Sequence, residues 1–118
     1  MAHILIVDTQ ALSRQQLVLL IERAGHRATA VATIAEASRV LQEGAPDLLA
    51  TDVTLTDGSS AALVRQALEL GAKTLMMTGN PERIVEFDGA GQPYLSKPFP
   101  SELFLQRVEE ILAAGDAA

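Results

Sequence analysis

The sequence predicts an α/β domain built around a mainly parallel β-sheet. Short apolar runs alternate along the chain with longer segments whose apolar residues recur at helical spacing. Strands that alternate with helices form parallel sheets, because each helix returns the chain to the start of the next strand. Crossovers of this kind are right-handed, which leaves few possible topologies.

Five segments have the composition of β-strands: residues 4–7 (ILIV), 27–32 (RATAVA), 48–51 (LLAT), 74–77 (TLMM) and 93–96 (PYLS). The first, third and fourth are continuously apolar, which predicts that they lie in the centre of the sheet with both faces covered. Residues 27–32 alternate in polarity, which is typical of an edge strand.

Five further segments predict helices, at residues 13–24, 34–43, 61–70, 81–87 and 101–114. Thr33 and Glu36 have the spacing of a capping box, and Gly44 marks the end of that helix. The helix at 81–87 is predicted to be only about two turns long, because glycines and prolines flank it. No linker or repeat interrupts the chain, so residues 1–118 are predicted to form one domain with a frayed tail at 113–118.

The composition excludes several classes of function. The chain contains no cysteine, so disulfides and thiolate metal sites are ruled out, and this absence fits a cytoplasmic protein. A net charge of −6 and only 3% aromatic residues argue against direct binding of nucleic acid. No apolar run approaches the length of a membrane span, and no secretory signal is evident.

Four polar residues share one position, directly after a predicted strand. They are Asp8, Asp52, Thr78 and Lys97. The carboxyl ends of neighbouring parallel strands meet at one edge of a sheet, where open α/β sheets bind ligands. A pair of carboxylates at that edge needs a counter-charge, which Lys97 or a bound cation could supply.

Each of these residues also has a purely structural interpretation. An aspartate after a strand is often the N-cap of the next helix, a threonine there is often a turn residue, and a lone lysine is usually solvated. The structural interpretation is weak for all four together, because four separate strand ends would each have to carry a residue suited to a binding site by chance.

Five segments carry a resemblance to the receiver domains of bacterial two-component response regulators, namely ILIVD (4–8), PDLLATD (46–52), LTDG (55–58), LMMTG (75–79) and YLSKPF (94–99). The resemblance covers essentially the whole chain. It implies a flavodoxin-like, doubly wound five-stranded parallel sheet with strand order 2-1-3-4-5. It also implies two-component signal transduction by phosphorelay.

The resemblance implies a role for each site residue. Asp52 would accept a phosphoryl group from a histidine kinase. Mg²⁺ would be held by Asp8, Asp52 and the backbone carbonyl of Thr54. Thr78 would donate a hydrogen bond to the phosphoryl group and Lys97 would pair with it. The metal and the lysine together would neutralise the charge that builds up as one anion attacks another.

Further expectations follow from the same resemblance. Tyr94 stands at the position of the aromatic switch that turns inward with Thr78 on activation, and the Lys97–Pro98 bond is expected to be cis. The chain would catalyse at most its own phosphotransfer and slow autodephosphorylation. Its partners would be a histidine kinase, or a hybrid kinase or phosphotransfer protein, and an unknown downstream protein, with no membrane.

Two residues depart from the family pattern. The family usually has a second acid after the first strand, and that acid contacts the metal directly, whereas this chain has Thr9. Because a threonine hydroxyl is a poor Mg²⁺ ligand, we expect weak Mg²⁺ binding. Gln10 could hold a water in compensation. Thr56 replaces the usual proline of the loop after Asp52, which predicts a freer loop.

Alternative functions stay open at this point. A pseudo-receiver, which acts as a phosphorylation-independent interaction module, is favoured by Thr9 and opposed by the retained Asp52, Thr78 and Lys97. A phosphatase of the haloacid dehalogenase type would need an acid where Gln10 stands, and a flavin or nucleotide binder would need a glycine-rich loop there. The sequence does not distinguish a stand-alone receiver from a piece of a longer regulator or hybrid kinase.

Overall fold

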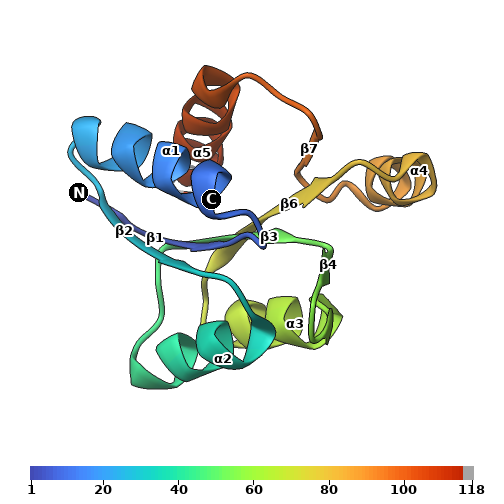
Figure 1. Cartoon of the computed structure of the whole chain (residues 1–118), viewed down its shortest axis with the longest axis horizontal. Coiled ribbons are helices and arrows are strands. Elements are labelled where there is room, and N and C mark those ends of the chain that lie inside the picture. Colours follow the sequence, from blue (N-terminus) through green and yellow to red (C-terminus); the bar gives the residue numbers. More distant parts are fainter. Residues whose placement is uncertain (116–118) are drawn as a thin grey trace.

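A computed structural model describes residues 1–115 and contains a five-stranded parallel sheet (Figure 1). The strands of this sheet are β1 (His3–Val7), β2 (Arg27–Val31), β3 (Leu48–Asp52), β6 (Lys73–Thr78) and β7 (Tyr94–Ser96). Their order is β2-β1-β3-β6-β7, and every neighbouring pair is parallel. This order confirms the predicted doubly wound topology, with β1, β3 and β6 in the centre and β2 at an edge.

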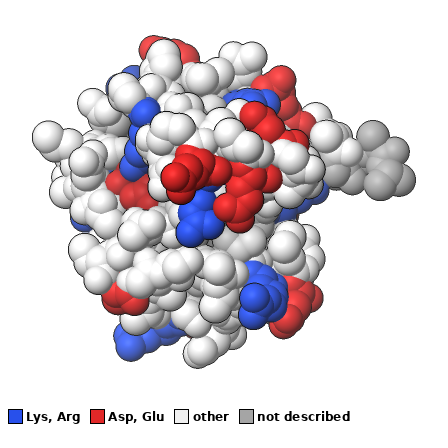
Figure 2. All heavy atoms as spheres, turned by 90° about the vertical axis from the view of Figure 1, so that its right-hand side faces the viewer, with Lys and Arg blue, Asp and Glu red and all other residues white. Residues whose placement is uncertain are grey.

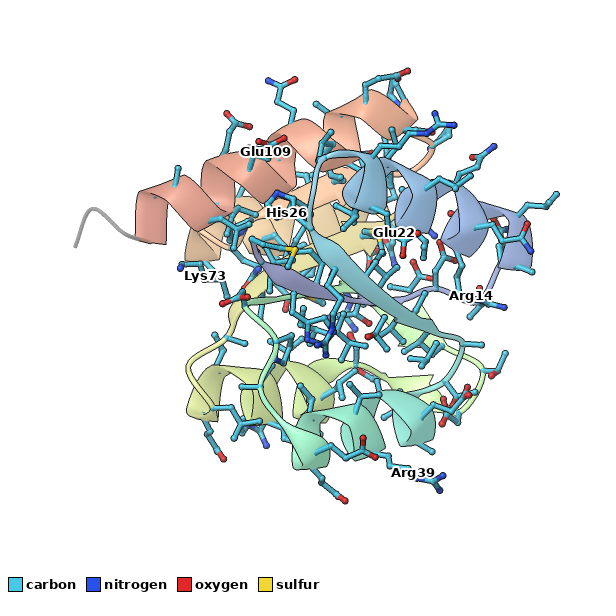
Figure 3. The ribbon with its side chains drawn as sticks, turned by 90° about the vertical axis from the view of Figure 1, so that its left-hand side faces the viewer. Arg14, Glu22, His26, Arg39, Lys73 and Glu109 are labelled. Carbon is cyan, nitrogen blue, oxygen red and sulfur yellow. The ribbon has the colours of Figure 1, made fainter. Side chains whose placement is uncertain are left out.

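Helices cover both faces of the sheet. They are α1 (Ala11–Arg23), α2 (Ile34–Glu43), α3 (Ala61–Glu69), α4 (Pro81–Ala90) and α5 (Ser101–Gly115). Helices α1 and α5 lie on one face and α2 and α3 on the other (Figures 1 and 3). Alternate residues of a strand point to opposite faces, so Ile4 and Ile6 pack with α1 and α5, while Leu5 and Val7 pack with α2 and α3.

The predicted capping box at the start of α2 is present. The Thr33 hydroxyl oxygen accepts a hydrogen bond from the Glu36 backbone N–H at 3.2 Å. The Glu36 carboxylate in turn accepts one from the backbone N–H of Ala32 at 3.3 Å. The side chain of Thr33 therefore begins α2 where the sequence predicts.

Helix α4 is longer than the sequence predicts. It continues through Gly89 to Ala90 and ends at Gly91, whose φ of 69° is a left-handed conformation that glycine adopts without strain. The expectation of a helix limited to residues 81–87 was therefore wrong. None of the α4 residues is buried, and the helix lies beside β7 at one side of the molecule (Figure 1).

The end of the chain also differs from its prediction. Helix α5 reaches Gly115, so residues 113–115 of the expected frayed tail are helical. The remainder of that tail, residues 116–118, lies outside the described residues.

The loop after Asp52 contains a short hairpin that the sequence analysis did not predict. Strands β4 (Thr54–Leu55) and β5 (Gly58–Ser59) pair antiparallel, and Gly58 supplies a φ of 133° after the turn. The Asp57 carboxylate accepts hydrogen bonds from the backbone N–H groups of Ile34 and Ala35, at 3.0 and 3.1 Å. The hairpin is thus fixed to the start of α2, so the loop is ordered without the proline that Thr56 replaces.

The carboxyl edge of the sheet lies on the face shown in Figure 2. Acidic and basic side chains are interspersed on this face, and the Lys and Arg residues seen there do not gather into a basic patch. Within residues 1–115, none of the helices has the length and apolar character needed to span a membrane.

Candidate functional site

A cavity of about 260 Å³ opens at the carboxyl edge of the sheet. The predicted site residues Asp52, Thr54, Thr78 and Lys97 all line it, together with Asn80. Asp8 is fully buried beside it, with its Oδ1 atom 3.7 Å from Nζ of Lys97. Residues from the ends of β1, β3, β6 and β7 therefore meet at one place, as parallel pairing requires.

Asp52 is the last residue of β3 and the acid that faces the cavity. Its backbone pairs with Met77 of β6, and it is 6% exposed. Nζ of Lys97 lies 2.7 Å from its Oδ1 atom, and the backbone N–H of Thr9 donates to its Oδ2 atom over a long 3.3 Å. The carboxylate is held by one cation and one weak hydrogen bond, so it keeps acceptor capacity that protein groups do not use.

The surroundings of Asp52 disfavour its charge. Burial raises the pKa of Asp52 above its ordinary value, and the neighbouring Asp8 carboxylate raises this pKa further. The ion pair with Lys97 and the Thr9 N–H oppose the rise without cancelling it. The folded protein therefore holds a destabilised carboxylate at the edge of the cavity, which is a common property of functional sites.

Asp8 is bonded mainly within its own segment of chain. Its Oδ1 atom accepts from the Gln10 backbone N–H at 2.9 Å, and its Oδ2 atom accepts from the Ser13 hydroxyl at 2.6 Å. The Arg14 guanidinium donates to the Asp8 carbonyl at 2.7 Å. The carboxylate thus joins the segment after β1 to the first turn of α1, but the N-cap of α1 is Gln10, so the N-cap interpretation of Asp8 is wrong.

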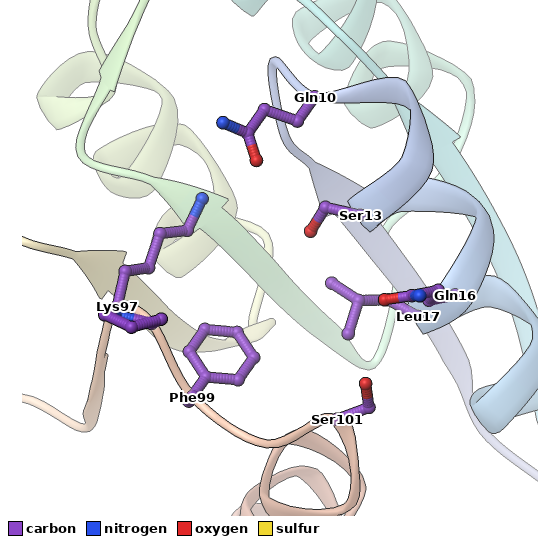
Figure 4. A pocket seen from close by; sticks show the side chains of 8 residues that line it. Gln10, Ser13, Gln16, Leu17, Lys97, Phe99 and Ser101 are labelled. Atoms are coloured by element: carbon purple, nitrogen blue, oxygen red, sulfur yellow. The ribbon is translucent and has the colours of Figure 1, made fainter.

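Lys97 follows β7 and reaches across the edge of the sheet to both acids. Its backbone N–H donates to the Thr78 carbonyl at 2.8 Å, which extends the pairing of β6 with β7. The Lys97–Pro98 peptide is cis, as the resemblance implies. A second cavity of about 350 Å³ lies on the α1 side of Lys97, where Gln10 and Ser13 face it (Figure 4).

Thr78 ends β6 with its hydroxyl beside the first cavity. The Oγ1 atom accepts from the backbone N–H of Asn80 at 3.0 Å, so its own proton is free for another acceptor. The Asn80 side chain accepts from the Glu82 N–H at 2.9 Å and caps α4. Thr78 is therefore linked by one hydrogen bond to Asn80, the N-cap of α4.

Tyr94 lies apart from this cavity, at the start of β7. Its ring is 6.1 Å from that of Phe87 on α4, measured between centroids, and Arg107 of α5 donates to its carbonyl at 3.4 Å. The carboxylate of Asp88 raises the pKa of the Tyr94 phenol. Tyr94, which is predicted to act as a switch, therefore belongs to β7 and contacts both α4 and α5.

The carboxylates at this edge of the sheet could hold one divalent cation. Asp8 and Asp52 bring two negative charges against one positive charge from Lys97, which leaves an excess that a cation would neutralise. Mg²⁺ commonly binds one or two protein carboxylates and completes its shell with water. No three His, Cys, Asp or Glu side chains gather as a metal-binding group within residues 1–115.

The sequence analysis missed three residues that hold the site in place, namely Ser13, Arg14 and Asp57. Ser13 and Arg14 lie five and six residues after Asp8, in the first turn of α1, so their bonds to Asp8 depend on how the chain turns between β1 and α1. The Asp57-Gly58 pair is a hairpin signal in sequence. Its contact with α2 depends on how the elements pack, which no local pattern encodes.

Comparisons with known proteins agree with this fold. A sequence model of the response regulator receiver domain matches residues 4–109. The virulence transcriptional regulatory protein PhoP of Salmonella choleraesuis is 26% identical over 117 residues, which cover 95% of this chain and 52% of that protein. The chain therefore spans about half the length of the curated relatives it matches.

Solved structures of similar proteins superpose on the whole fold. A CheY-like receiver domain protein from Methanospirillum hungatei is 26% identical with a TM-score of 0.87, covering 99% of this chain and 98% of that one. A response regulator from Chloroflexus aurantiacus is 31% identical with a TM-score of 0.80, covering 95% and 98%. With the match to residues 4–109, these similarities show that the chain belongs to the response regulator receiver domain family of two-component systems.

Proposed function

We propose that this receiver domain accepts a phosphoryl group on Asp52 from the phosphohistidine of a histidine kinase, a hybrid kinase or a phosphotransfer protein. The observation that carries the proposal is the ion pair of 2.7 Å between Asp52 and Lys97 at the edge of a cavity of about 260 Å³. Receiver domains typically interact with histidine kinases and downstream effectors, and they generally bind Mg²⁺ at the phosphorylation site.

In the proposed reaction, a carboxylate oxygen of Asp52 attacks the phosphorus of the donor. A bond forms between that oxygen and phosphorus, the phosphorus–nitrogen bond breaks, and its electron pair stays on the imidazole. Charge then accumulates on the phosphoryl oxygens, where Lys97 can neutralise part of it. Bound Mg²⁺, held by Asp8, Asp52 and the Thr54 carbonyl, would supply further charge neutralisation.

Product recognition is assigned to Thr78. Its hydroxyl lines the same cavity as Asp52, and its proton is free to donate to a phosphoryl oxygen. The Thr78 hydroxyl also accepts a hydrogen bond from the backbone N–H of Asn80, the N-cap of α4. If the hydroxyl moved to donate to the phosphoryl group, Asn80 and the start of α4 would move with it. Because no α4 residue is buried, this helix can move at little cost in apolar burial. Tyr94, which contacts α4, would move with it to change a protein-interaction surface.

The second candidate function is a pseudo-receiver that binds its partner without phosphorylation. One observation favours it: Thr9 supplies no carboxylate at the site. The missing acid weakens the metal site and leaves Asp52 in place. Under this alternative the protein would dock its partner equally well with an inert residue at position 52.

Labelling with a small phosphodonor separates the two functions. The protein is incubated with acetyl phosphate and Mg²⁺, and intact mass is measured; we expect a gain of one phosphoryl group in the wild type and none in Asp52→Asn. Asp57→Asn is the matched control, since it changes an acid of the same loop that lies outside the cavity. Labelling that persists in Asp52→Asn would refute the assignment, and an unlabelled wild type would favour the pseudo-receiver.

A further inference from the structure

We infer that Ser13 is a positioning residue that orients the Asp8 carboxylate for Mg²⁺. The inference rests on the proposed function, because it deepens the role of Asp8 at the phosphorylation site. Ser13 does not line the cavity that contains Asp52; it lies on α1 and acts through Asp8 alone.

The first step concerns the contact itself. The Ser13 hydroxyl donates to Oδ2 of Asp8 at 2.6 Å, which is the short distance typical of a hydrogen bond to a charged oxygen. Asp8 is 0% exposed, so water does not compete for this oxygen. The bond therefore fixes how the carboxylate is rotated.

The second step concerns what else could fix that rotation. The Gln10 N–H contacts only Oδ1, and so does Nζ of Lys97, at 3.7 Å. Lys97 is also drawn to Asp52, whose Oδ1 atom is 2.7 Å away. Among the described residues, Ser13 is thus the one hydrogen-bond donor to Oδ2, and without it the planar carboxylate would be held through Oδ1 alone.

The third step concerns why rotation matters in this chain. Thr9 brings no second carboxylate after β1, so Asp8 is the only acid that this strand end offers a cation. A partner that orients a metal-binding carboxylate is commonly worth 10–100-fold in metal affinity. We therefore expect the orientation of a single carboxylate to weigh more here than at a site with two adjacent acids.

The role of the Ser13 hydroxyl can be tested with a conservative substitution, Ser13→Thr. Ser13 lines the cavity of about 350 Å³ between α1 and the segment that follows Lys97, as does Gln16 (Figure 4). A threonine at position 13 keeps the hydroxyl and has room there for its methyl group. Gln16 makes no hydrogen bond with Asp8, so Gln16→Ala changes the same cavity without altering the contacts of the carboxylate.

The test is a Mg²⁺ titration of the unphosphorylated protein, followed through the amide signals of Thr9, Gln10 and Asp52 by NMR. We expect Ser13→Ala to weaken Mg²⁺ binding by about tenfold, Ser13→Thr to restore it, and Gln16→Ala to leave it unchanged. Melting temperatures of all variants are measured in parallel. A merely structural serine would lower the melting temperature of Ser13→Ala and leave its Mg²⁺ affinity at the wild-type value.

The outcomes separate this inference from the proposed function. If the wild type is labelled on Asp52 but Ser13→Ala binds Mg²⁺ as tightly as the wild type, or more tightly, the inference is overturned and the phosphoacceptor stands. If Ser13→Thr fails to restore the affinity, the hydroxyl is not the group that matters and the inference also fails. An unlabelled wild type that still loses Mg²⁺ affinity in Ser13→Ala supports the positioning role and removes the phosphoacceptor.

Discussion

Two loops at the carboxyl edge of the sheet use the same residue type in opposite ways. The loop after β1 contributes Asp8, whose two oxygens accept from Gln10 and Ser13 at 2.9 and 2.6 Å. The loop after β3 begins at Asp52, the last residue of that strand, and within residues 1–115 the one backbone N–H that donates to its carboxylate, that of Thr9, lies 3.3 Å away. Both acids are buried and share the ammonium group of Lys97.

Both aspartates are buried, so the difference between them lies in the hydrogen-bond donors that each carboxylate receives. A carboxylate with its oxygens satisfied is a stable part of the fold, whereas one with few donors carries an uncompensated cost of desolvation. This cost appears as the raised pKa of Asp52, whose first cause is burial. A nucleophile needs an oxygen that other groups leave free, so under the proposed function Asp52 would be the reactive acid and Asp8 the fixed one.

The largest expected effect is an opposite change in stability when each acid is replaced by asparagine. Asp8→Asn weakens hydrogen bonds to a buried charge, so we expect a loss of about 1–3 kcal/mol and a melting temperature lower by roughly 4–12 °C. Asp52→Asn removes a charge that its site disfavours, so we expect a melting temperature higher by on the order of a few degrees. Thermal unfolding at neutral pH, without Mg²⁺, measures both.

The pH dependence of the Asp52→Asn effect follows from its sign. The pKa of Asp52 is higher in the folded protein than its ordinary value of 3.8. The wild type therefore loses stability as the pH rises from 3.8 to the raised pKa, because the folded state releases its proton later than the unfolded state, and Asp52→Asn does not. The advantage of the variant should therefore be largest above the raised pKa of Asp52 and vanish below pH 3.8. If both variants shifted the melting temperature in the same direction, the contrast between the loops would be wrong.

A smaller effect is expected from making the β1 loop more acidic. The backbone N–H of Thr9 already contacts Asp52, so an aspartate at position 9 would place a second carboxylate beside the cation. We expect Thr9→Asp to tighten Mg²⁺ binding by at least about tenfold, whereas the neutral Thr9→Asn should not tighten it. Calorimetric titration of the three proteins measures this, and equal affinities would mean that Gln10 or a water already does the work of the missing acid.

The sequence predicts the sheet well because the apolar run of each strand is a local property. Asp8, Asp52, Thr78 and Lys97 could be placed at one edge because parallel pairing brings strand ends together wherever they lie in the sequence. The two-residue strands β4 and β5 are too short to show any periodicity, so they were missed. The extension of α4 through Gly89 was missed because glycine only weakens a helix and does not forbid it.

What surrounds each acid could not be predicted from the sequence. That Ser13 reaches Asp8 depends on where α1 begins, and helix starts are uncertain by a few residues in any pattern. That Asp57 reaches α2 depends on the packing of two elements whose contact has no local signature. The sequence therefore predicted the charged residues of the candidate site but not the hydrogen-bond donors that surround Asp8 and Asp52 differently.

The smallest effect is expected at Asp57. This residue joins the loop after β3 to the start of α2, and not to α3, the helix that follows the loop in the chain. Its carboxylate accepts from the N–H groups of Ile34 and Ala35, and the bond to Ile34 is the first cause of its lowered pKa. Since this pKa lies below 3.8 in the folded protein, the contribution of Asp57 to stability is present above pH 3.8 and is lost as the pH falls through the lowered value. Asp57→Ala should therefore lower the melting temperature slightly at neutral pH, with a difference that disappears in acid.

Hydrogen exchange gives the same prediction a local readout. The amides of Ile34 and Ala35 should exchange faster in Asp57→Ala, while the Glu36 amide, which Thr33 caps, should keep its protection. Asp57→Asn retains one acceptor oxygen and should protect only one of the two amides well. Unchanged exchange at both amides, or a loss of stability that is the same at every pH, would show that the hairpin is held by its own pairing and by buried Leu55 rather than by the bond to α2.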